Sequence, residues 1–154
     1  MVFLVNLGRV VFAPLIEPLA ADFAVSPTEL GAVATLAWLG SAVSRIPTGY
    51  LLTRLDRHTV VVGSGVGLTA AALFTAVAPS VPALSAGAFL LGLASGAYFV
   101  AGNPLVSELF PETVGRALGV HGTAAGLAAV AAPLAVGAVL VVGDWRLTFL
   151  GMAA

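Results

Sequence analysis

The sequence predicts an all-α, polytopic membrane protein, because of its composition, the length of its apolar runs and the short turns between them. Of the 154 residues, 60% are hydrophobic and only 8% are charged. Soluble domains carry about 25% charged residues, so this chain lacks the side chains that a water-facing surface requires. Uninterrupted runs of about 20 apolar residues fit membrane-crossing helices, whereas the strands of membrane barrels alternate in polarity over about ten residues.

Five complete spans and the start of a sixth are expected in a single transmembrane helical domain over residues 1–154. The turn before the second span carries a helix-start signal, with Ser26 as the N-cap, Pro27 at the first position and Glu29 three residues after the cap. The expected helices are 2–21, 30–52, 59–78, 83–106 and 117–142, followed by a partial helix over 147–154.

Glycines are frequent in the third, fourth and fifth spans. Small residues at a spacing of four allow helix backbones to approach closely in lipid, so these glycines are expected to lie at helix contacts. They are Gly63, Gly65, Gly67, Gly92, Gly96, Gly122 and Gly126.

The positive charges in the turns predict the orientation of the chain. Arg54, Arg57 and Arg116 lie in the turns after the second and fourth spans, and Arg146 alone lies in a turn on the other side. Because cytoplasmic loops carry the excess of positive charge, the N-terminus is expected on the cytoplasmic side. The expected location is the cell (plasma) membrane, as a multi-pass protein with the lipid bilayer as its solvent.

The turn Gly49–His58 holds a pattern of glycine and basic residues between two apolar runs. Gly49, Arg54, Arg57 and His58 resemble the Gly-x-x-x-Asp-Arg-x-Gly-Arg-Arg/Lys pattern between helices 2 and 3 of major facilitator superfamily transporters. Thr53 stands where that family has its aspartate, and Asp56 stands where it has glycine. The resemblance implies a gating turn formed by Gly49, Arg54, Asp56 and Arg57. The alternative is a positively charged anchor on the cytoplasmic side.

Other stretches resemble the same family in the same order. Residues 6–9 (Asn-Leu-Gly-Arg) resemble the polar patch of its first helix, residues 107–119 its turn between helices 4 and 5, and residues 144–149 its turn between helices 5 and 6. The resemblance implies half of a twelve-helix transporter fold. The implied function is secondary transport of a small solute by alternating access, with the missing C-terminal half of the transporter as partner. Since the sixth run stops after Ala154, the chain is expected to be a fragment.

Three ionisable residues lie inside the expected spans, where a charge is costly and marks a functional site by default. Arg45 lies nine residues before Arg54, or about 13 Å at 1.5 Å per residue, and Arg9 lies thirteen residues before Asp22, or about 20 Å. Two guanidinium groups at similar depth on neighbouring helices predict an anionic substrate, bound by Arg45, Arg9 and Asn6. The alternative is that each arginine reaches the interface or pairs with a backbone carbonyl.

The third ionisable residue is Glu17, near the outer end of the first span. It is a candidate ion or proton site, since burial of a carboxylate favours its protonated form. The alternative is a partly solvated residue at the end of a helix.

Other chemistry has little support in the sequence. With no cysteine and two histidines, neither a disulfide nor a metal cluster is expected, and no cofactor motif, catalytic constellation or basic aromatic patch for nucleic acid is present. The chain is therefore not expected to be an enzyme. Its second possible function is that of a small stand-alone membrane protein, which dimerises or serves as an assembly module through its glycine-rich faces.

Overall fold

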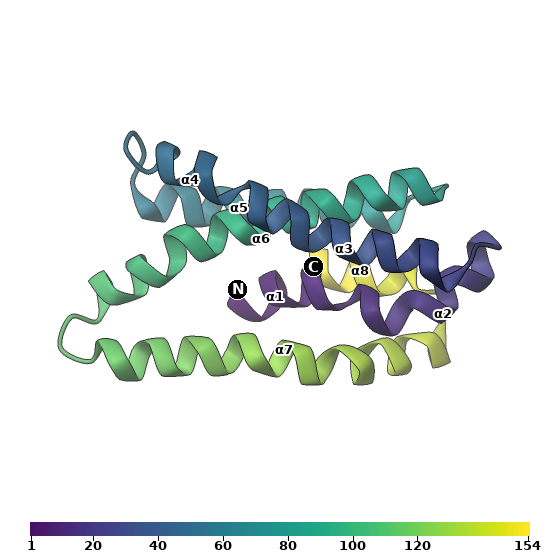
Figure 1. Cartoon of the computed structure of the whole chain (residues 1–154). Helices are drawn as coiled ribbons and strands as arrows, with labels where there is room; N and C mark the ends of the chain where they lie inside the picture. The colour runs from purple at the N-terminus through teal and green to yellow at the C-terminus, as the bar shows by residue number, and fades with distance from the viewer.

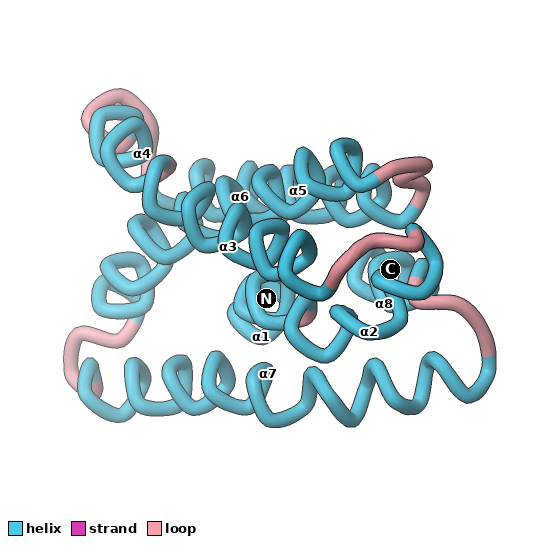
Figure 2. The backbone as a smooth tube through the Cα atoms, turned by 45° about the vertical axis from the view of Figure 1, so that its right-hand side comes forward, coloured by secondary structure: helices cyan, strands magenta, loops and turns pink.

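A computed structural model describes all 154 residues, and the chain forms helices joined by short turns, without strands. The elements follow in the order α1 (Val2–Val10), α2 (Phe12–Phe23), α3 (Pro27–Val43), α4 (Arg45–Leu51), α5 (Arg57–Ala76), α6 (Val81–Leu109), α7 (Val114–Val142) and α8 (Arg146–Ala153). In Figures 1 and 2, α3, α4, α5 and α6 form one side of the bundle, α7 forms the opposite side, and α1, α2 and α8 lie between them.

Two of the expected spans are interrupted, and a proline explains each break. The ring of a proline clashes with the carbonyl four residues earlier and removes the N–H that would bond to it. Pro14 therefore disturbs the helix at Val10, where α1 ends, and the axes of α1 and α2 differ by 46°. Pro47 disturbs the helix at Val43, where α3 ends.

Side-chain hydrogen bonds support the second break. The Ser44 hydroxyl donates to the carbonyl oxygen of Ser41 at 3.1 Å, and the Thr48 hydroxyl donates to that of Ser44 at 2.7 Å. Both hydroxyl-bearing residues are buried. These bonds hold the backbone at the point where α4 begins with Arg45, so the arginine follows the break directly.

Three helices are long and apolar enough to cross a membrane, namely α5, α6 and α7, and the bent pair of α1 and α2 makes a fourth. The expected second span corresponds to α3 and α4, which Ser44 separates, and the expected partial helix corresponds to α8. The predicted cap of the second span is confirmed, because Ser26 and Glu29 form a reciprocal capping box with Pro27 at the first position.

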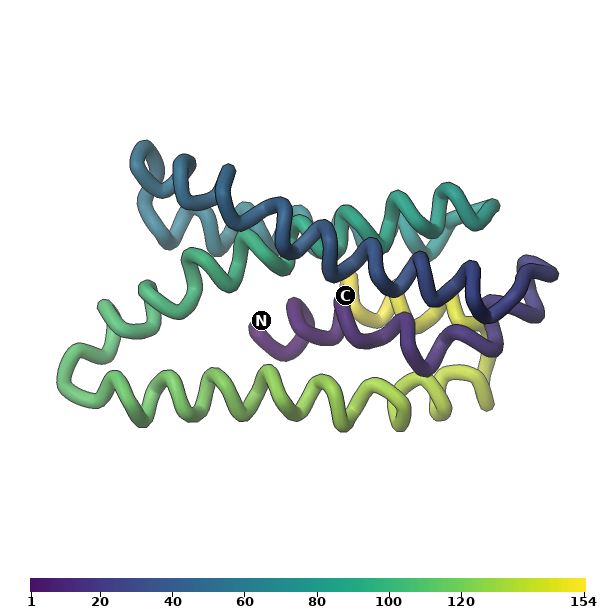
Figure 3. The backbone as a smooth tube through the Cα atoms, in the orientation of Figure 1, coloured from purple at the N-terminus to yellow at the C-terminus, as the bar shows by residue number.

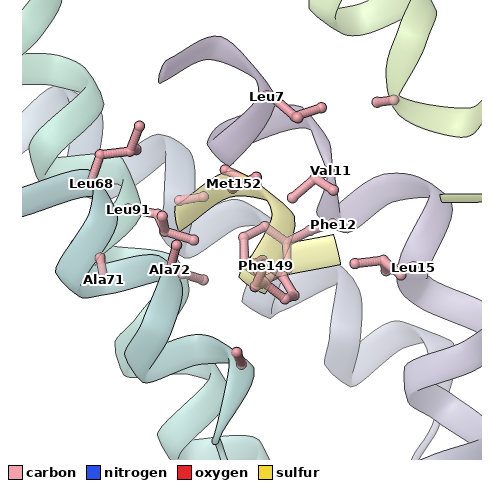
Figure 4. Packing of buried hydrophobic residues seen from close by; sticks show 14 of the residues in the cluster. Leu7, Val11, Phe12, Leu15, Leu68, Ala71, Ala72, Leu91, Phe149 and Met152 are labelled. Carbon is pink, nitrogen blue, oxygen red and sulfur yellow. The ribbon is translucent and has the colours of Figure 1, made fainter. Parts of the chain in front are cut away.

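The core lies where α8 enters between α1 and α2 on one side and α5 and α6 on the other (Figure 4). Phe149 of α8 is fully buried and its ring centroid lies 5.5 Å from that of Phe12. Met152 reaches the region of Leu68 and Leu91. Figure 3 shows that α1 starts part way along α7 and that α8 ends near the middle of the bundle.

A polar cluster joins the C-terminal end of α2 to the start of α8. The Asp22 carboxylate accepts hydrogen bonds from the indole N–H of Trp145 at 2.9 Å and from Arg146 at 3.3 Å. Arg146 also pairs with Asp144 at 2.8 Å, and the ring of Phe23 lies 5.9 Å from that of Trp145. These contacts connect the first and the sixth spans at one end of the bundle.

Candidate functional site: a cavity with two arginines

Arg9 and Arg45 line the same cavity, which has a volume of about 340 Å³. Arg9 comes from α1 and Arg45 from α4, and α6 completes the lining with Phe99, Val100 and Asn103. Every ion pair of the chain involves either Arg57 or Arg146, so no carboxylate lies within 4.0 Å of either cavity arginine. The cavity therefore presents two positive charges that no acidic side chain neutralises.

Arg9 is buried, with 8% of its surface exposed, and its direct side-chain contacts are neutral groups. Its guanidinium carbon lies 4.7 Å from the centre of the Trp38 ring and 4.6 Å from that of Phe99. One terminal nitrogen donates to the Ser41 hydroxyl at 3.4 Å, and the other donates to the side-chain oxygen of Asn6. Aromatic faces attract a cation, so these contacts offset part of the cost of burying the charge.

Asn6 uses both ends of its side-chain amide inside the protein. Its oxygen accepts from Arg9, and its nitrogen donates to the carbonyl oxygen of Ala125 on α7 at 2.6 Å. Asn6 thus links the buried arginine to the opposite side of the bundle.

Arg45 has the opposite environment. It is exposed, and none of the hydrogen bonds or ion pairs within the chain involves its side chain. An arginine presents five N–H donors in a planar fork that matches a carboxylate, and those of Arg45 are open to a ligand.

Glu17 lies in α2 and is exposed, and no basic side chain lies within ion-pair distance of it. It does not line the cavity with the two arginines. The structure thus places Arg9 and Arg45 at one cavity and Asn6 against Arg9 outside its lining, and leaves Glu17 apart from them.

The arginines in and next to the turn after α4 have different partners. Arg54 donates to the Tyr50 hydroxyl at 2.6 Å and lies over the ring of that residue. Arg57 forms an ion pair with Glu108 at the end of α6. Gly49 has open space at the position of a side chain, with nothing within 4 Å. Arg54 and Arg57 therefore contact α4 and α6, respectively, within this chain.

Asp56 caps the start of α5. Its carboxylate accepts from the backbone N–H of Thr59 at 2.7 Å and from the hydroxyl of the same residue at 2.8 Å. These hydrogen bonds, helped by the charge of His58, hold the pKa of the Asp56 carboxyl below its usual value. Both oxygens of the carboxylate are engaged in this cap.

Sequence reasoning did not identify the aromatic residues around Arg9 or the part of α6 that lines the cavity. Asn103 could have indicated that part of α6, because a polar amide is uncommon in an apolar helix. Phe99 and Trp38 carry no such signal, since aromatic residues are common throughout membrane helices. A further polar contact lies between α6 and α7, where the Tyr98 hydroxyl lies 2.9 Å from the His121 ring nitrogen Nε2.

A separate groove of about 630 Å³ lies on α5 and α6. Its lining is mainly aliphatic and contains no charged residue. It therefore lacks the groups needed to fix the orientation of a polar ligand, and the smaller cavity with the arginines is the better candidate site. No group of three or more histidine, aspartate or glutamate side chains is placed to hold a metal ion.

Two characterised relatives match about two thirds of the chain. The gentisate transporter of Corynebacterium glutamicum is 28% identical over 103 residues, which are 67% of this chain and 23% of the relative. The niacin transporter NiaP of Acinetobacter baylyi is 30% identical over 104 residues, which are 68% of this chain and 24% of the relative. The matched segment thus spans about a quarter of the length of either relative. Both names point to a transporter and not to an enzyme.

The helical fold, the membrane-length apolar helices and these matches agree with a further comparison, which covers the whole chain. The family model of the Major Facilitator Superfamily matches residues 1–154. The chain is a multi-pass membrane protein with a partial transporter fold, and it belongs to the Major Facilitator Superfamily.

Proposed function

We propose that the chain forms one half of a secondary transporter that carries a small organic anion across the membrane by alternating access. The observation that carries this proposal is the cavity in which Arg9 and Arg45 present two charges without an acidic partner. An uncompensated charge at membrane depth is costly, and an anionic ligand supplies the missing counter-charge.

Carboxylates that carry an aromatic ring are the class of substrate to test first. The two relatives are named for gentisate and niacin, and both compounds are aromatic carboxylic acids. A guanidinium fork binds a carboxylate in two parallel hydrogen bonds, and the exposed side chain of Arg45 is free to do so. The ring of such a substrate suits the apolar walls provided by Phe99 and Val100.

The proposal includes a second half that closes the cavity from the other side. Transporters of this kind place the substrate near the midplane between two related halves that rock against each other. The relatives are long enough for such a half, since the matched segment covers 23% and 24% of their lengths. Most of the surface of α7 is uncovered within this chain and is available to a partner.

Two further assignments follow from this proposal. The turn with Gly49, Arg54, Asp56 and Arg57 acts as the cytoplasmic gate, with the N-terminus cytoplasmic and the protein in the cell membrane. The open space at Gly49 supports this assignment, because a helix of the second half can approach the backbone there. Glu17, exposed and without an ion-pair partner, is assigned as the proton or cation site.

The test is the uptake of radiolabelled benzoate by the complete transporter with Arg45→Gln, reconstituted in liposomes. Removal of the anion contact is expected to raise KM by about tenfold or more. Arg45→Lys retains the charge and is expected to recover part of the affinity. Arg116→Gln is the matched control, because Arg116 is exposed and lies outside the cavity. Unchanged uptake of aromatic and aliphatic carboxylates by Arg45→Gln would contradict the proposal.

The second candidate function is a stand-alone module that dimerises, and the glycines of α7 favour it. Gly115, Gly119, Gly122 and Gly126 have nothing within 4 Å of an added side chain, so a second copy could approach that face closely. A stable homodimer of the purified chain in detergent, lost in Gly122→Leu, would support this function. A monomer over the whole range of concentration would exclude it.

A further inference from the structure

The two cavity arginines are not equivalent, because the contacts of Arg9 are already occupied. Trp38 and Phe99 place their rings within 5 Å of its guanidinium carbon, at 4.7 Å and 4.6 Å. Ser41 and Asn6 accept hydrogen bonds from its two terminal nitrogens. The N–H at Nε has no partner and is sealed from solvent, and each terminal nitrogen keeps one further N–H. A ligand can reach few of the donors of Arg9 unless these contacts are broken.

The same contacts join four helices at one point. Arg9 lies on α1, Trp38 and Ser41 lie on α3, and Phe99 lies on α6. Through Asn6 the network continues to the Ala125 carbonyl of α7. A lysine has a compact charge and no planar fork, so it cannot serve two rings and two acceptors in the same way.

Phe99 connects this network to the cavity. Its ring is in contact with Arg9, and the residue itself lines the cavity beside Arg45. Arg45 is exposed and has no ion-pair partner. An entering carboxylate therefore meets an open guanidinium at Arg45 and an engaged one at Arg9.

We propose that Arg9 is a positioning residue of the anion cavity and not an anion ligand. It holds the ring of Phe99 at the cavity wall and joins α1, α3 and α6 around it, while Arg45 makes the direct contact with the anion. This inference rests on the proposed function and reassigns one of the residues that the sequence had suggested as a ligand.

The experiment compares benzoate with benzamide, a neutral analogue of the same shape. Binding is measured on the purified chain in detergent and uptake on the complete transporter. A Trp145→Phe background leaves Trp38 as the sole tryptophan, so the emission of Trp38 reports on the surroundings of Arg9. Melting temperature is recorded for every variant, and titrations are interpreted on the folded fraction.

Substitutions of the two arginines are expected to change different properties of the protein. Arg45→Gln weakens benzoate binding by about tenfold, abolishes the preference for benzoate over benzamide and leaves ligand-free Trp38 emission unchanged. Arg9→Lys keeps a positive charge but shifts Trp38 emission. It weakens benzoate and benzamide by the same factor, about fivefold, so the preference between them remains.

A second variant tests the same inference without altering any charge. Phe99→Leu removes the ring that Arg9 is proposed to position, and an equal loss for benzoate and benzamide is expected. In the double variant Arg9→Lys with Phe99→Leu, the losses are expected to be less than multiplicative, since both changes disturb one wall. Arg9→Lys with Arg45→Gln is expected to multiply the two losses.

Three results would contradict either the role of Arg9 or the proposed function. If Arg9→Lys weakens benzoate alone and leaves Trp38 emission unchanged, Arg9 is an anion ligand and the inference is overturned while the proposed function stands. If Phe99→Leu changes neither affinity, the inference is also overturned, even where Arg9→Lys fails to fold. If Arg45→Gln leaves benzoate binding and uptake unchanged, the proposed function itself fails.

Discussion

The α3–α6 interface and the α7 helix use glycine in opposite ways. At Gly40 of α3 and at Gly92 and Gly96 of α6, an added Cβ would collide with a backbone carbonyl oxygen of the facing helix. Along α7 the glycines have nothing within 4 Å of an added Cβ. Those glycines are Gly115, Gly119, Gly122, Gly126 and Gly137.

The difference shows that small residues at regular spacing do not by themselves indicate where a helix packs. In lipid, dispersion forces and close backbone approach hold helices together, so a glycine contributes only where a partner helix lies against it. The glycines of α3 and α6 have that partner within this chain. Those of α7 do not, and only Ala128, Ala132 and Val136 of that helix are buried.

The largest expected effect comes from Gly92→Leu. A side chain at this position would meet the backbone carbonyl of Ala37, which cannot move aside as a flexible side chain would. Separation of α3 and α6 is expected to cost about 3 kcal/mol or more of unfolding free energy. The measurement is loss of helical circular dichroism as the denaturing detergent fraction rises in mixed micelles.

Gly126→Leu is the matched control, because it adds the same side chain in open space on α7. Its effect on unfolding is expected to stay within about 0.5 kcal/mol. Equal destabilisation by the two variants would show that the contrast between α3–α6 and α7 does not exist in solution.

A smaller effect is expected from Asn6→Leu, which cuts the link between α1 and α7. The change removes the hydrogen bond to the Ala125 carbonyl and leaves one nitrogen of Arg9 without its acceptor. Hydrogen bonds between membrane helices contribute about 0.6 kcal/mol on average and those to charged groups more, so a loss of about 1–2 kcal/mol is expected.

The absence of cysteine allows this effect to be located by thiol labelling. Ala128→Cys places a thiol at a buried position of α7, and Ala37→Cys places one at a buried position of α3. In the Asn6→Leu background, maleimide is expected to label position 128 faster and position 37 at an unchanged rate. Acceleration at both positions would mean that α7 and α3 separate as one unit.

The smallest expected effect is a pH-dependent change in stability at the Asp56 cap of α5, which lies outside the α3–α6 interface and α7. Because its hydrogen bonds to Thr59 hold the pKa of Asp56 below the usual value, the cap is fully stabilising above pH of about 4. Its contribution is lost as the pH falls through the lowered pKa. The melting temperatures of the native chain and Asp56→Asn are expected to differ most near pH 6 and to converge in acid. A difference that is constant with pH would mean that ionisation of Asp56 does not stabilise the cap.

The sequence predicts local features of the fold well. The capping box at Ser26 and Glu29 needs only residues that are neighbours in the chain, and the structure confirms it. The breaks after Val10 and Val43 were also visible in principle, since each lies four residues before a proline. Length and hydrophobicity alone present each of these stretches as a continuous span.

The surroundings of Arg9 could not be predicted in the same way. Its partner Ser41 is 32 residues away in the chain, and Asn6 contacts a carbonyl 119 residues away. Which side chains meet at such distances depends on the rotation and tilt of each helix, and packing against neighbours determines both. The environment of each glycine depends on the same geometry, so glycines at equal spacing in α6 and α7 have different environments.

The two proline-induced breaks also have a consequence for how the sequence can vary. Each break lies four residues before a proline, whose ring removes one backbone hydrogen bond and crowds the carbonyl at that point. Arg9 precedes one break and Arg45 follows the other. The other lining residues, such as Asn103, lie on α6, so an exchange there leaves the backbone at both breaks unchanged. Under the proposed function, single exchanges on α6 would change which anions bind while the two arginines keep their places.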